Sequence, residues 1–187
     1  MEPDGPPNLG KVRDLIGRAI ARNSCVADFH CNMGLTLSAL GRANEAVASY
    51  IRAIVIDPRH ALSYSNLGNL LANLGRPKEA EARLRRALEI NKDFAEAHYN
   101  LGNVLGAQGK LDEAVAHYRR AVALAPKFAN AHHNLGHVLD QQGKTEEAAA
   151  QFRRVIELDP RHAGAHYNLG NILREKTDYA AAIVPKS

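Results

Sequence analysis

The 187-residue sequence has no tryptophan, only two cysteines and 5% aromatic residues. It contains no run of about eighteen apolar residues, so it predicts no transmembrane helix. The N-terminus lacks a basic segment followed by an apolar one, and no signal peptide is indicated. Cys25 and Cys31 are six residues apart, which matches neither a metal site nor a redox motif. These absences favour a cytoplasmic protein with two reduced thiols.

Glycine instead recurs with a fixed period of 34 residues, and a period of this length is typical of repeat architectures. In each case the glycine ends an Asn-Leu-Gly or Asn-Met-Gly block, at Gly34, Gly68, Gly102, Gly136 and Gly170. A second glycine follows seven residues later, at Gly41, Gly75, Gly109 and Gly143. An alanine follows twelve residues after the first, at Ala46, Ala80, Ala114, Ala148 and Ala182.

Within each unit, apolar residues fall at helical spacing on both sides of the second glycine. Pro77 suits the first turn of a second helix, and Asp57-Pro58 and Asp159-Pro160 end such helices. Small residues such as Gly68 and Ala80 permit close helix approach. Each unit is therefore predicted to be a helix-turn-helix hairpin that buries its apolar face by stacking on its neighbours.

This pattern resembles the tetratricopeptide repeat (TPR), and the resemblance covers residues 27–176. It implies an all-α fold, a right-handed superhelical solenoid of TPR hairpins. The predicted organisation is a disordered N-terminus (1–9), a degenerate half-repeat or capping helix (10–26), four repeats (27–60, 61–94, 95–128 and 129–162) and a truncated fifth repeat (163–187).

The last repeat departs from the pattern. Thr177 replaces the turn glycine, and Pro185 cuts off the second helix that begins near Ala180. No polar capping helix follows, although terminal repeats normally have one. Two interpretations stay open: a piece of a longer repeat protein, or a short protein whose last helix frays. A bare last repeat also favours pairing between copies, through Tyr179, Ile183 and Val184.

Chemistry beyond the repeat is scarce. The net charge of +4 comes partly from arginines that recur on the second helices. One interpretation is a track that binds the phosphates of nucleic acid. The other is a solvated helix face whose charge is balanced by glutamates. No aromatic residues interleave the arginines, so nucleic acid is disfavoured as a partner. His133 and His137 share a helix face, but no third ligand is placed to complete a metal site. His98, His132 and His166 recur as packing residues.

No catalytic group is evident, and no cofactor or metal is expected. The serines have no histidine–acid partner in a recognisable context, namely Ser24, Ser38, Ser49, Ser63 and Ser65. The chain is therefore interpreted as a non-enzyme.

The TPR resemblance implies that the first helix of each repeat lines a concave groove. Asparagine offers a donor and an acceptor, so it can pair with an extended peptide backbone. A ladder of asparagines at one-repeat spacing is formed by Asn32, Asn66, Asn100, Asn134 and Asn168. The candidate peptide-binding residues are Asn32, Asn66, Asn69, Tyr99, Asn100, Asn103, His133, Asn134, His137, Tyr167, Asn168 and Asn171. An equally weighted alternative is that the ladder asparagines form hydrogen bonds between repeats.

Two TPR subfamilies offer a comparison for the groove residues. Chaperone-tail binders use a carboxylate clamp, but its lysine position holds Cys31, Ser65, Tyr99, His133 or Tyr167. The Asn-Leu-Gly-Asn blocks resemble the TPR arm of O-linked N-acetylglucosamine transferases. Three functions follow: a scaffold that binds a peptide or partner protein, a self-assembly module with possible homo-oligomers through the C-terminal end, and a substrate-recruiting fragment of a larger enzyme. No membrane partner is expected.

Overall fold

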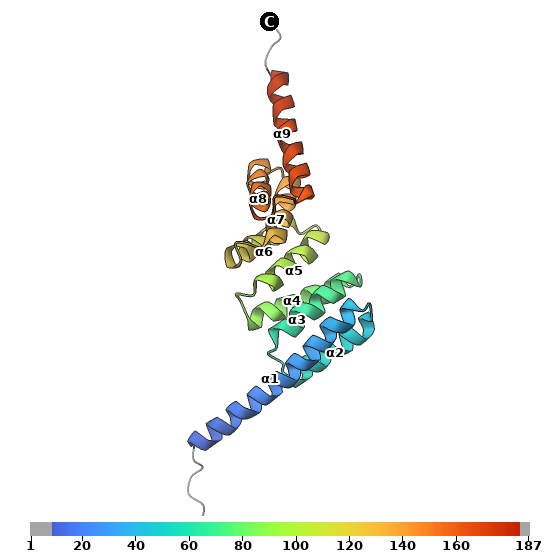
Figure 1. Cartoon of the computed structure of the whole chain (residues 1–187), viewed down its shortest axis with the longest axis vertical. Coiled ribbons are helices and arrows are strands. Elements are labelled where there is room, and N and C mark those ends of the chain that lie inside the picture. Colours follow the sequence, from blue (N-terminus) through green and yellow to red (C-terminus); the bar gives the residue numbers. More distant parts are fainter. Residues whose placement is uncertain (1–8, 184–187) are drawn as a thin grey trace, which may run out of the picture. The chain divides into compact units, whose positions relative to one another are not determined.

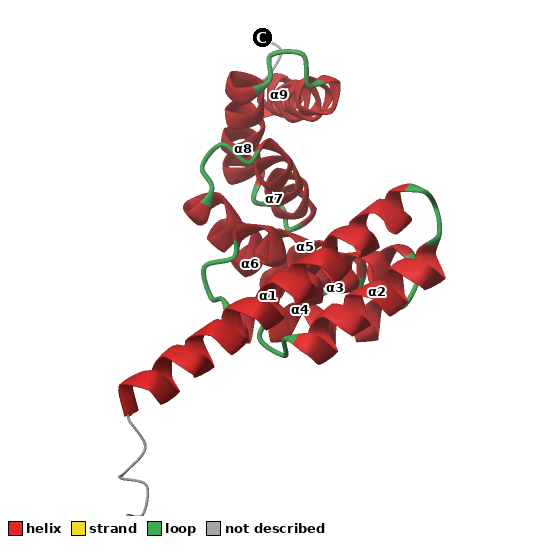
Figure 2. Cartoon of the chain, turned by 60° about the horizontal axis from the view of Figure 1, so that its bottom comes forward, coloured by secondary structure: helices red, strands yellow, loops and turns green. Residues whose placement is uncertain are grey.

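A computed structural model describes residues 9–183, which form nine α-helices and no strand (Figures 1 and 2). Side chains are described for residues 22, 23 and 25–175. The N-terminal segment expected to be disordered lies outside this range, apart from Leu9. The helices are α1 (Leu9–Ala39), α2 (Ala43–Ile56), α3 (Ala61–Asn73), α4 (Pro77–Ile90), α5 (Ala95–Ala107), α6 (Leu111–Leu124), α7 (Ala129–Gln141), α8 (Thr145–Leu158) and α9 (Ala163–Ile183). The all-α expectation is confirmed.

The helices fall into two compact units, residues 1–91 and 92–187. In the first unit, α1 packs against α2, α3 packs against α4, and α2 also contacts α3. In the second unit, α5 pairs with α6 and α7 pairs with α8, while α6 contacts α7 and α8 contacts α9. Each pair is a helical hairpin, and within each unit the hairpins stack on one another.

Glycine makes the turn inside each hairpin. Gly41, Gly75, Gly109 and Gly143 have φ of 73°, 72°, 75° and 72°, a left-handed conformation that glycine adopts without steric cost. At the equivalent place in the last repeat, β-branched Thr177 disfavours that conformation. Accordingly, α9 runs on through Thr177 to Ile183 without a turn. The expected break at Val184 and Pro185 lies outside the described residues.

The N-terminal helix is also longer than expected. Residues 10–26 were predicted as a separate helix of a degenerate half-repeat, but α1 runs without a turn from Leu9 to Ala39. The sequence explains this continuity. Where later repeats end a helix with Asp57-Pro58, this segment has Asn23-Ser24, so no proline stops the helix.

The first glycine of each block permits close contact between the two helices of a hairpin. A Cβ added to Gly34 or Gly102 would lie 2.6 or 2.7 Å from Cε1 of Tyr50 or Tyr118, and one on Gly68 would lie 2.6 Å from Cγ of Leu84. These aromatic and leucine side chains are almost fully buried. The core therefore depends on a large side chain of the second helix lying on bare backbone of the first.

Candidate functional site

The ladder asparagines that bond across repeats share one geometry. Each amide nitrogen lies near the residue 35 positions earlier: Asn66 Nδ2 near Cys31 Sγ (3.5 Å), Asn134 Nδ2 near Tyr99 Oη (3.3 Å) and Asn168 Nδ2 near His133 Nε2 (3.5 Å). These contacts join neighbouring repeats within each unit, the first with the second, the third with the fourth and the fourth with the fifth. They agree with the interpretation in which the ladder asparagines form hydrogen bonds between repeats. Asn32 is exposed and Asn100 is half-buried.

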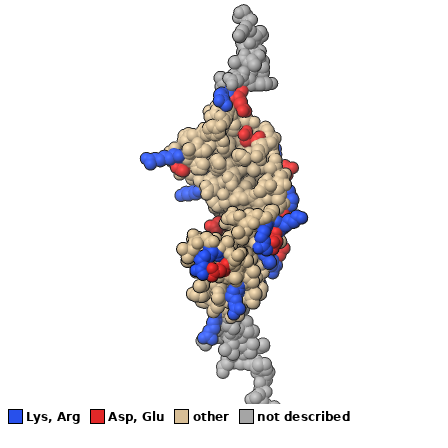
Figure 3. All heavy atoms as spheres, turned by 90° about the vertical axis from the view of Figure 1, so that its right-hand side faces the viewer, with Lys and Arg blue, Asp and Glu red and all other residues tan. Residues whose placement is uncertain are grey.

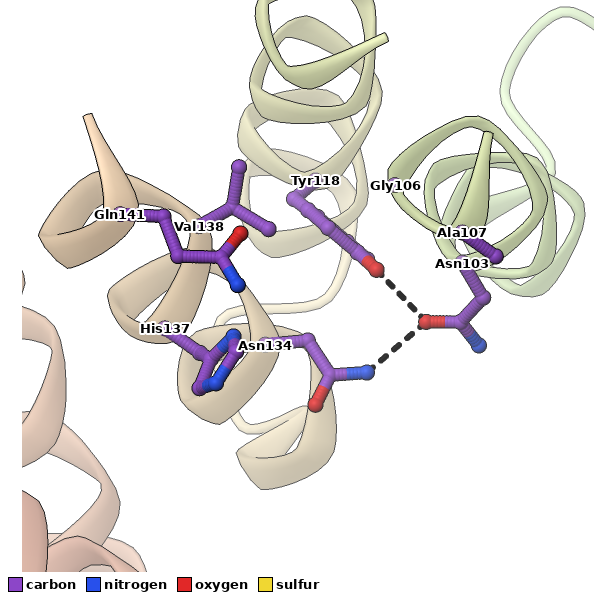
Figure 4. A pocket seen from close by; sticks show the side chains of 8 residues that line it. All are labelled: Asn103, Gly106, Ala107, Tyr118, Asn134, His137, Val138 and Gln141. Atoms are coloured by element: carbon purple, nitrogen blue, oxygen red, sulfur yellow. Dashed lines mark hydrogen bonds between the residues drawn. The ribbon is translucent and has the colours of Figure 1, made fainter. Parts of the chain in front are cut away.

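A tighter hydrogen-bond network is centred on Asn103 in α5. Tyr118 Oη donates to Asn103 Oδ1 over 2.7 Å, and Asn134 Nδ2 donates to the same oxygen over 2.8 Å (Figure 4). Tyr118 is only 3% exposed. Burial raises the pKa of Tyr118, and nearby Tyr99 raises it further, so its phenol keeps the proton that it donates. The network links three helices, α5, α6 and α7.

A pocket of about 300 Å³ lies over this network (Figure 4). Its rim residues Ala107, His137 and Gln141 are exposed, while Tyr118 and Val138 at its floor are buried. Figure 4 shows the Gln141 side chain on one side of the space and the Tyr118 hydroxyl on the other, where the hydroxyl is directed toward Asn103 Oδ1. The pocket therefore combines uncharged hydrogen-bonding groups with apolar walls. Its lining consists of Asn103, Gly106, Ala107, Tyr118, Asn134, His137, Val138 and Gln141.

The structure brings only part of the predicted site together here. Asn103, Asn134 and His137 line the pocket. Beside it, the Tyr99 ring packs on Phe128, with ring centroids 4.8 Å apart. The His133 ring lies between Phe152 and His162, at 5.7 and 4.8 Å. Elsewhere, Tyr167 is 70% exposed, Asn69 is exposed, and Asn171 Oδ1 lies 3.5 Å from the Arg174 guanidinium.

Sequence reasoning missed Gly106, Ala107, Val138 and Gln141 as pocket residues. Gly106 carried a usable signal because it does not belong to either glycine series. The equivalent positions in the other repeats hold Ser38, Ala72, Asp140 and Arg174. Gln141 follows His137 by four residues on the same helix, so the two share a face.

Comparisons with known proteins agree with this architecture. Models of the tetratricopeptide repeat match residues 25–93, 84–116 and 133–185, and a model described as TPR repeat matches residues 102–143. The solved structure of YrrB, described as a TPR protein with an unusual peptide-binding site, is 30% identical, with a TM-score of 0.71 over 89% of this chain and 86% of YrrB. The chain belongs to the TPR family.

Two further structures share the fold. MamA is 25% identical over 77% of this chain and 84% of MamA, with a TM-score of 0.71. PilF from Pseudomonas aeruginosa is 24% identical over 84% of this chain and 72% of PilF, with a TM-score of 0.78. No curated protein matches the sequence. The fold is thus an all-α TPR array, the architecture of a protein-interaction scaffold. The likeness to transferase arms stays a prediction.

The histidines that recur in the TPR units connect helices to loops. Nε2 of His98, His132 and His166 lies 3.0, 3.2 and 3.0 Å from the carbonyl oxygen six residues earlier. The Nδ1 atoms of His98 and His132 reach the second helix, at His117 (2.9 Å) and Gln151 (2.8 Å). His98 and His132 therefore pack between the two helices of their repeats, as predicted, whereas His166 is exposed. Within the described part of the chain, no group of three or more His, Cys, Asp or Glu residues is placed to hold a metal ion.

One serine does have a histidine–acid partner, contrary to the sequence analysis. Ser63 Oγ lies 2.7 Å from His60 Nδ1, and His60 Nε2 lies 2.8 Å from Asp28 Oδ1. The sequence concealed this arrangement because Asp28 precedes His60 by 32 residues, in a different helix. The sequence did contain one indication of it. His60 and Ser63 occupy positions at which the next two TPR units have Phe94 with Ala97 and Phe128 with Ala131.

The arrangement has a structural role. The Ser63 side chain is fully buried, so its hydroxyl is closed to a substrate, whereas a nucleophile must reach the reacting atom. The Ser63 backbone N–H donates to His60 Nδ1 over 3.3 Å, which caps the N-terminus of α3. The His60 Nε2–H donates to Asp28 and ties α1 to α3. His60 therefore secures the stacking of the first two TPR hairpins.

The arginines predicted to form a track are largely ion-paired. Arg85 and Arg86 pair with Glu81 and Glu89 of their own helix, at 2.9 and 2.7 Å. In the second unit, Arg119 pairs with Glu147, Arg120 with Asp93, and Arg154 with Glu157. Figure 3 shows basic and acidic side chains beside one another on the face that it draws. Across residues 9–183, no helix is both long and apolar enough to cross a membrane.

The lowered pKa values of two histidines predict that the protein loses stability at mildly acidic pH. Burial lowers the pKa of His98, opposed by the Lys92 carbonyl; Arg120 lowers it further and Asp93 raises it. Burial also lowers the pKa of His133, opposed by Asn134 and assisted by His162 and His137. A histidine with a lowered folded-state pKa binds protons more readily in the unfolded chain. The free energy of unfolding is therefore highest above about pH 6.5 and falls as the pH drops below it.

The measurement is urea unfolding of the intact chain at pH 7.5, 6.5 and 5.5. The double variant His98→Tyr with His133→Tyr should show a smaller decrease, because tyrosine does not titrate in this range. Tyrosine already occupies both positions in other repeats, at Tyr64 and Tyr99. An equal decrease in the double variant would assign the effect to other groups.

Proposed function

We propose that this TPR array binds an extended segment of a partner protein along α5, α7 and α9 of its second unit, anchored in the pocket between α5, α6 and α7. The pocket is the observation that carries the proposal. Its polar groups are amides, a phenol and an imidazole, and its described lining residues include no Lys, Arg, Asp or Glu.

This chemistry suits a peptide backbone. Gln141 offers a donor and an acceptor. Asn134 uses its Nδ2 on Asn103 and Tyr99 and keeps Oδ1 as an acceptor, and Tyr118, which donates its proton to Asn103, keeps lone pairs to accept with. Tyr99, Asn100, His133, Tyr167, Asn168 and Asn171 extend the proposed contact surface within this unit. The contribution of Asn32, Asn66 and Asn69 in the first unit stays a prediction. The peptide-binding site reported for YrrB supports the same class of function.

The pocket chemistry also limits the kind of partner. No cationic clamp faces the pocket, so acidic tails gain no counter-charge there. Each net hydrogen bond contributes about 0.5–1.5 kcal/mol, and ordering a flexible peptide opposes binding. A dissociation constant in the range of about 1 μM to 1 mM follows.

A random peptide library screened against the intact chain tests the proposal. The selected peptides are titrated against Ala107→Arg, which places a long side chain on the pocket rim, and against Ala150→Arg. Both alanines are exposed, and Ala150 lies on α8 and does not line the pocket. Ala107→Arg should weaken binding about tenfold or more. Ala150→Arg should leave it within about twofold.

Equal affinities for both variants would show that the peptides bind away from the pocket, and no selected peptide at all would refute peptide binding. Circular dichroism of both variants provides the folding control, because arginine at an exposed helix position changes stability by only about 0.5 kcal/mol.

A further inference from the structure

The pocket depends on one residue that breaks the repeat. Gly106 lies where the equivalent positions hold Ser38, Ala72, Asp140 and Arg174. A Cβ built at Gly106 would lie 4.0 Å from Tyr118 Oη and 3.9 Å from Ala114 Cβ. It would therefore be in van der Waals contact with the Tyr118 hydroxyl. The missing side chain leaves that hydroxyl accessible from the pocket.

The pocket has the size and walls for a ring. Its volume is about 300 Å³, and a cavity of about 150 Å³ already holds benzene in an engineered protein. Gly106, Ala107 and Val138 provide apolar surface. A flexible side chain such as glutamine loses up to about 2 kcal/mol of rotamer entropy on immobilisation, whereas an aromatic side chain has only two rotatable bonds.

The polar groups favour a hydroxyl at the tip of that ring. Tyr118 Oη uses its proton on Asn103 Oδ1, so it is left as an acceptor. The Gln141 side chain, at the rim of the pocket, makes no hydrogen bond to another described residue and has both a donor and an acceptor to offer. A charged tip would lose water without meeting an opposite charge.

From these observations we propose that the pocket takes the side chain of one tyrosine of the bound segment, with its hydroxyl between the Tyr118 hydroxyl and the Gln141 amide. This specificity rests on the proposed function, because it assigns a residue preference to the same peptide site. Gly106 and Gln141 are the residues that determine it, Gly106 by leaving space and Gln141 by pairing with the hydroxyl.

The test uses a blocked pentapeptide of four alanines around a central tyrosine, with phenylalanine, glutamine, lysine or glutamate as the central alternatives. Binding is followed through the side-chain amide NMR signals of Asn103 and Asn134 in the intact chain. The tyrosine peptide should bind about threefold to tenfold tighter than the phenylalanine peptide. The glutamine, lysine and glutamate peptides should bind more weakly still.

Two variants separate space from hydrogen bonding. Gly106→Ala should weaken the tyrosine peptide about tenfold, because the methyl group fills the floor of the pocket. Gln141→Leu should reduce the preference for the tyrosine peptide over the phenylalanine peptide without abolishing it, because Tyr118 Oη can still accept from the tyrosine hydroxyl. Equal binding of these two peptides to the unmodified chain would overturn the tyrosine assignment, and so would unchanged affinity in Gly106→Ala.

Those negative results differ from failure of the proposed function. If library-selected peptides still bind and still respond to Ala107→Arg, peptide binding stands and only the tyrosine preference is refuted. If neither library peptides nor pentapeptides bind, both proposals are refuted.

Discussion

Gly102→Ala should lower the free energy of unfolding by about 1–3 kcal/mol, whereas Gly106→Ala, four residues further along α5, should raise it by about 0.5–1 kcal/mol. Both changes add one methyl group to the same helix and gain the same helix propensity. They differ in what the methyl group meets. At Gly102 it would lie 2.7 Å from the Tyr118 ring, and at Gly106 its nearest neighbour is 3.9 Å away.

Chemical denaturation of the intact chain, followed by far-UV circular dichroism, measures both changes. The Tyr118 ring is buried between helices and cannot shift without disturbing its bond to Asn103. Changes of the same sign in the two variants would contradict the close approach of α5 and α6. Gly136→Ala provides an independent repetition, because its methyl group would lie 2.8 Å from the Phe152 ring.

His60→Phe should destabilise the protein by about 2–4 kcal/mol. The ring volume is largely kept, but α3 loses its N-cap, a loss of about 1 kcal/mol. The buried Ser63 hydroxyl also loses its partner, which costs about 1–3 kcal/mol. The link to Asp28 is lost as well, although Asp28 is largely exposed and adds little.

The matched control for His60 copies a pair that the chain already uses. His60→Phe with Ser63→Ala recreates the combination found at Phe94 and Ala97. Removing the hydroxyl removes the unpaired group, so the double variant should recover about 1–3 kcal/mol relative to His60→Phe alone. A double variant as unstable as the single one would mean that the hydroxyl's pairing contributes nothing.

The sequence was sufficient for the helices and turns because those depend on local residues. The turn at Gly75 requires a left-handed backbone conformation that favours glycine, and the contact of Leu84 with α3 leaves no room for a side chain at Gly68. Both requirements recur every 34 residues. The two helices that exceeded the prediction, α1 and α9, are those whose stop signals are missing, at Asn23-Ser24 and Thr177. A missing stop signal is a weaker pattern than a stop signal that is present, so the sequence predicts a separate degenerate half-repeat where the structure continues one helix.

The site was less predictable because it depends on contacts between repeats. The Asn134 side-chain amide could donate a hydrogen bond to a bound peptide or to Tyr99 and Asn103. The identity of the residue alone does not distinguish these two roles. The contact between Asp28 and His60 follows from stacking, which fixes a separation of 32 residues that no local pattern contains. Gly106 was the exception, since comparing the repeats position by position would have found it.

The asparagine bonds give the repeat interfaces within each unit a polarity. The donor lies on the following repeat and the acceptor on the preceding one, at Asn66 and Cys31 in one unit and at Asn134 and Tyr99 in the other. A two-fold symmetric dimer requires the same surface on both partners. Copies that associated through repeat-type surfaces would therefore have to join head to tail. Such heterologous contacts close into rings or continue as filaments.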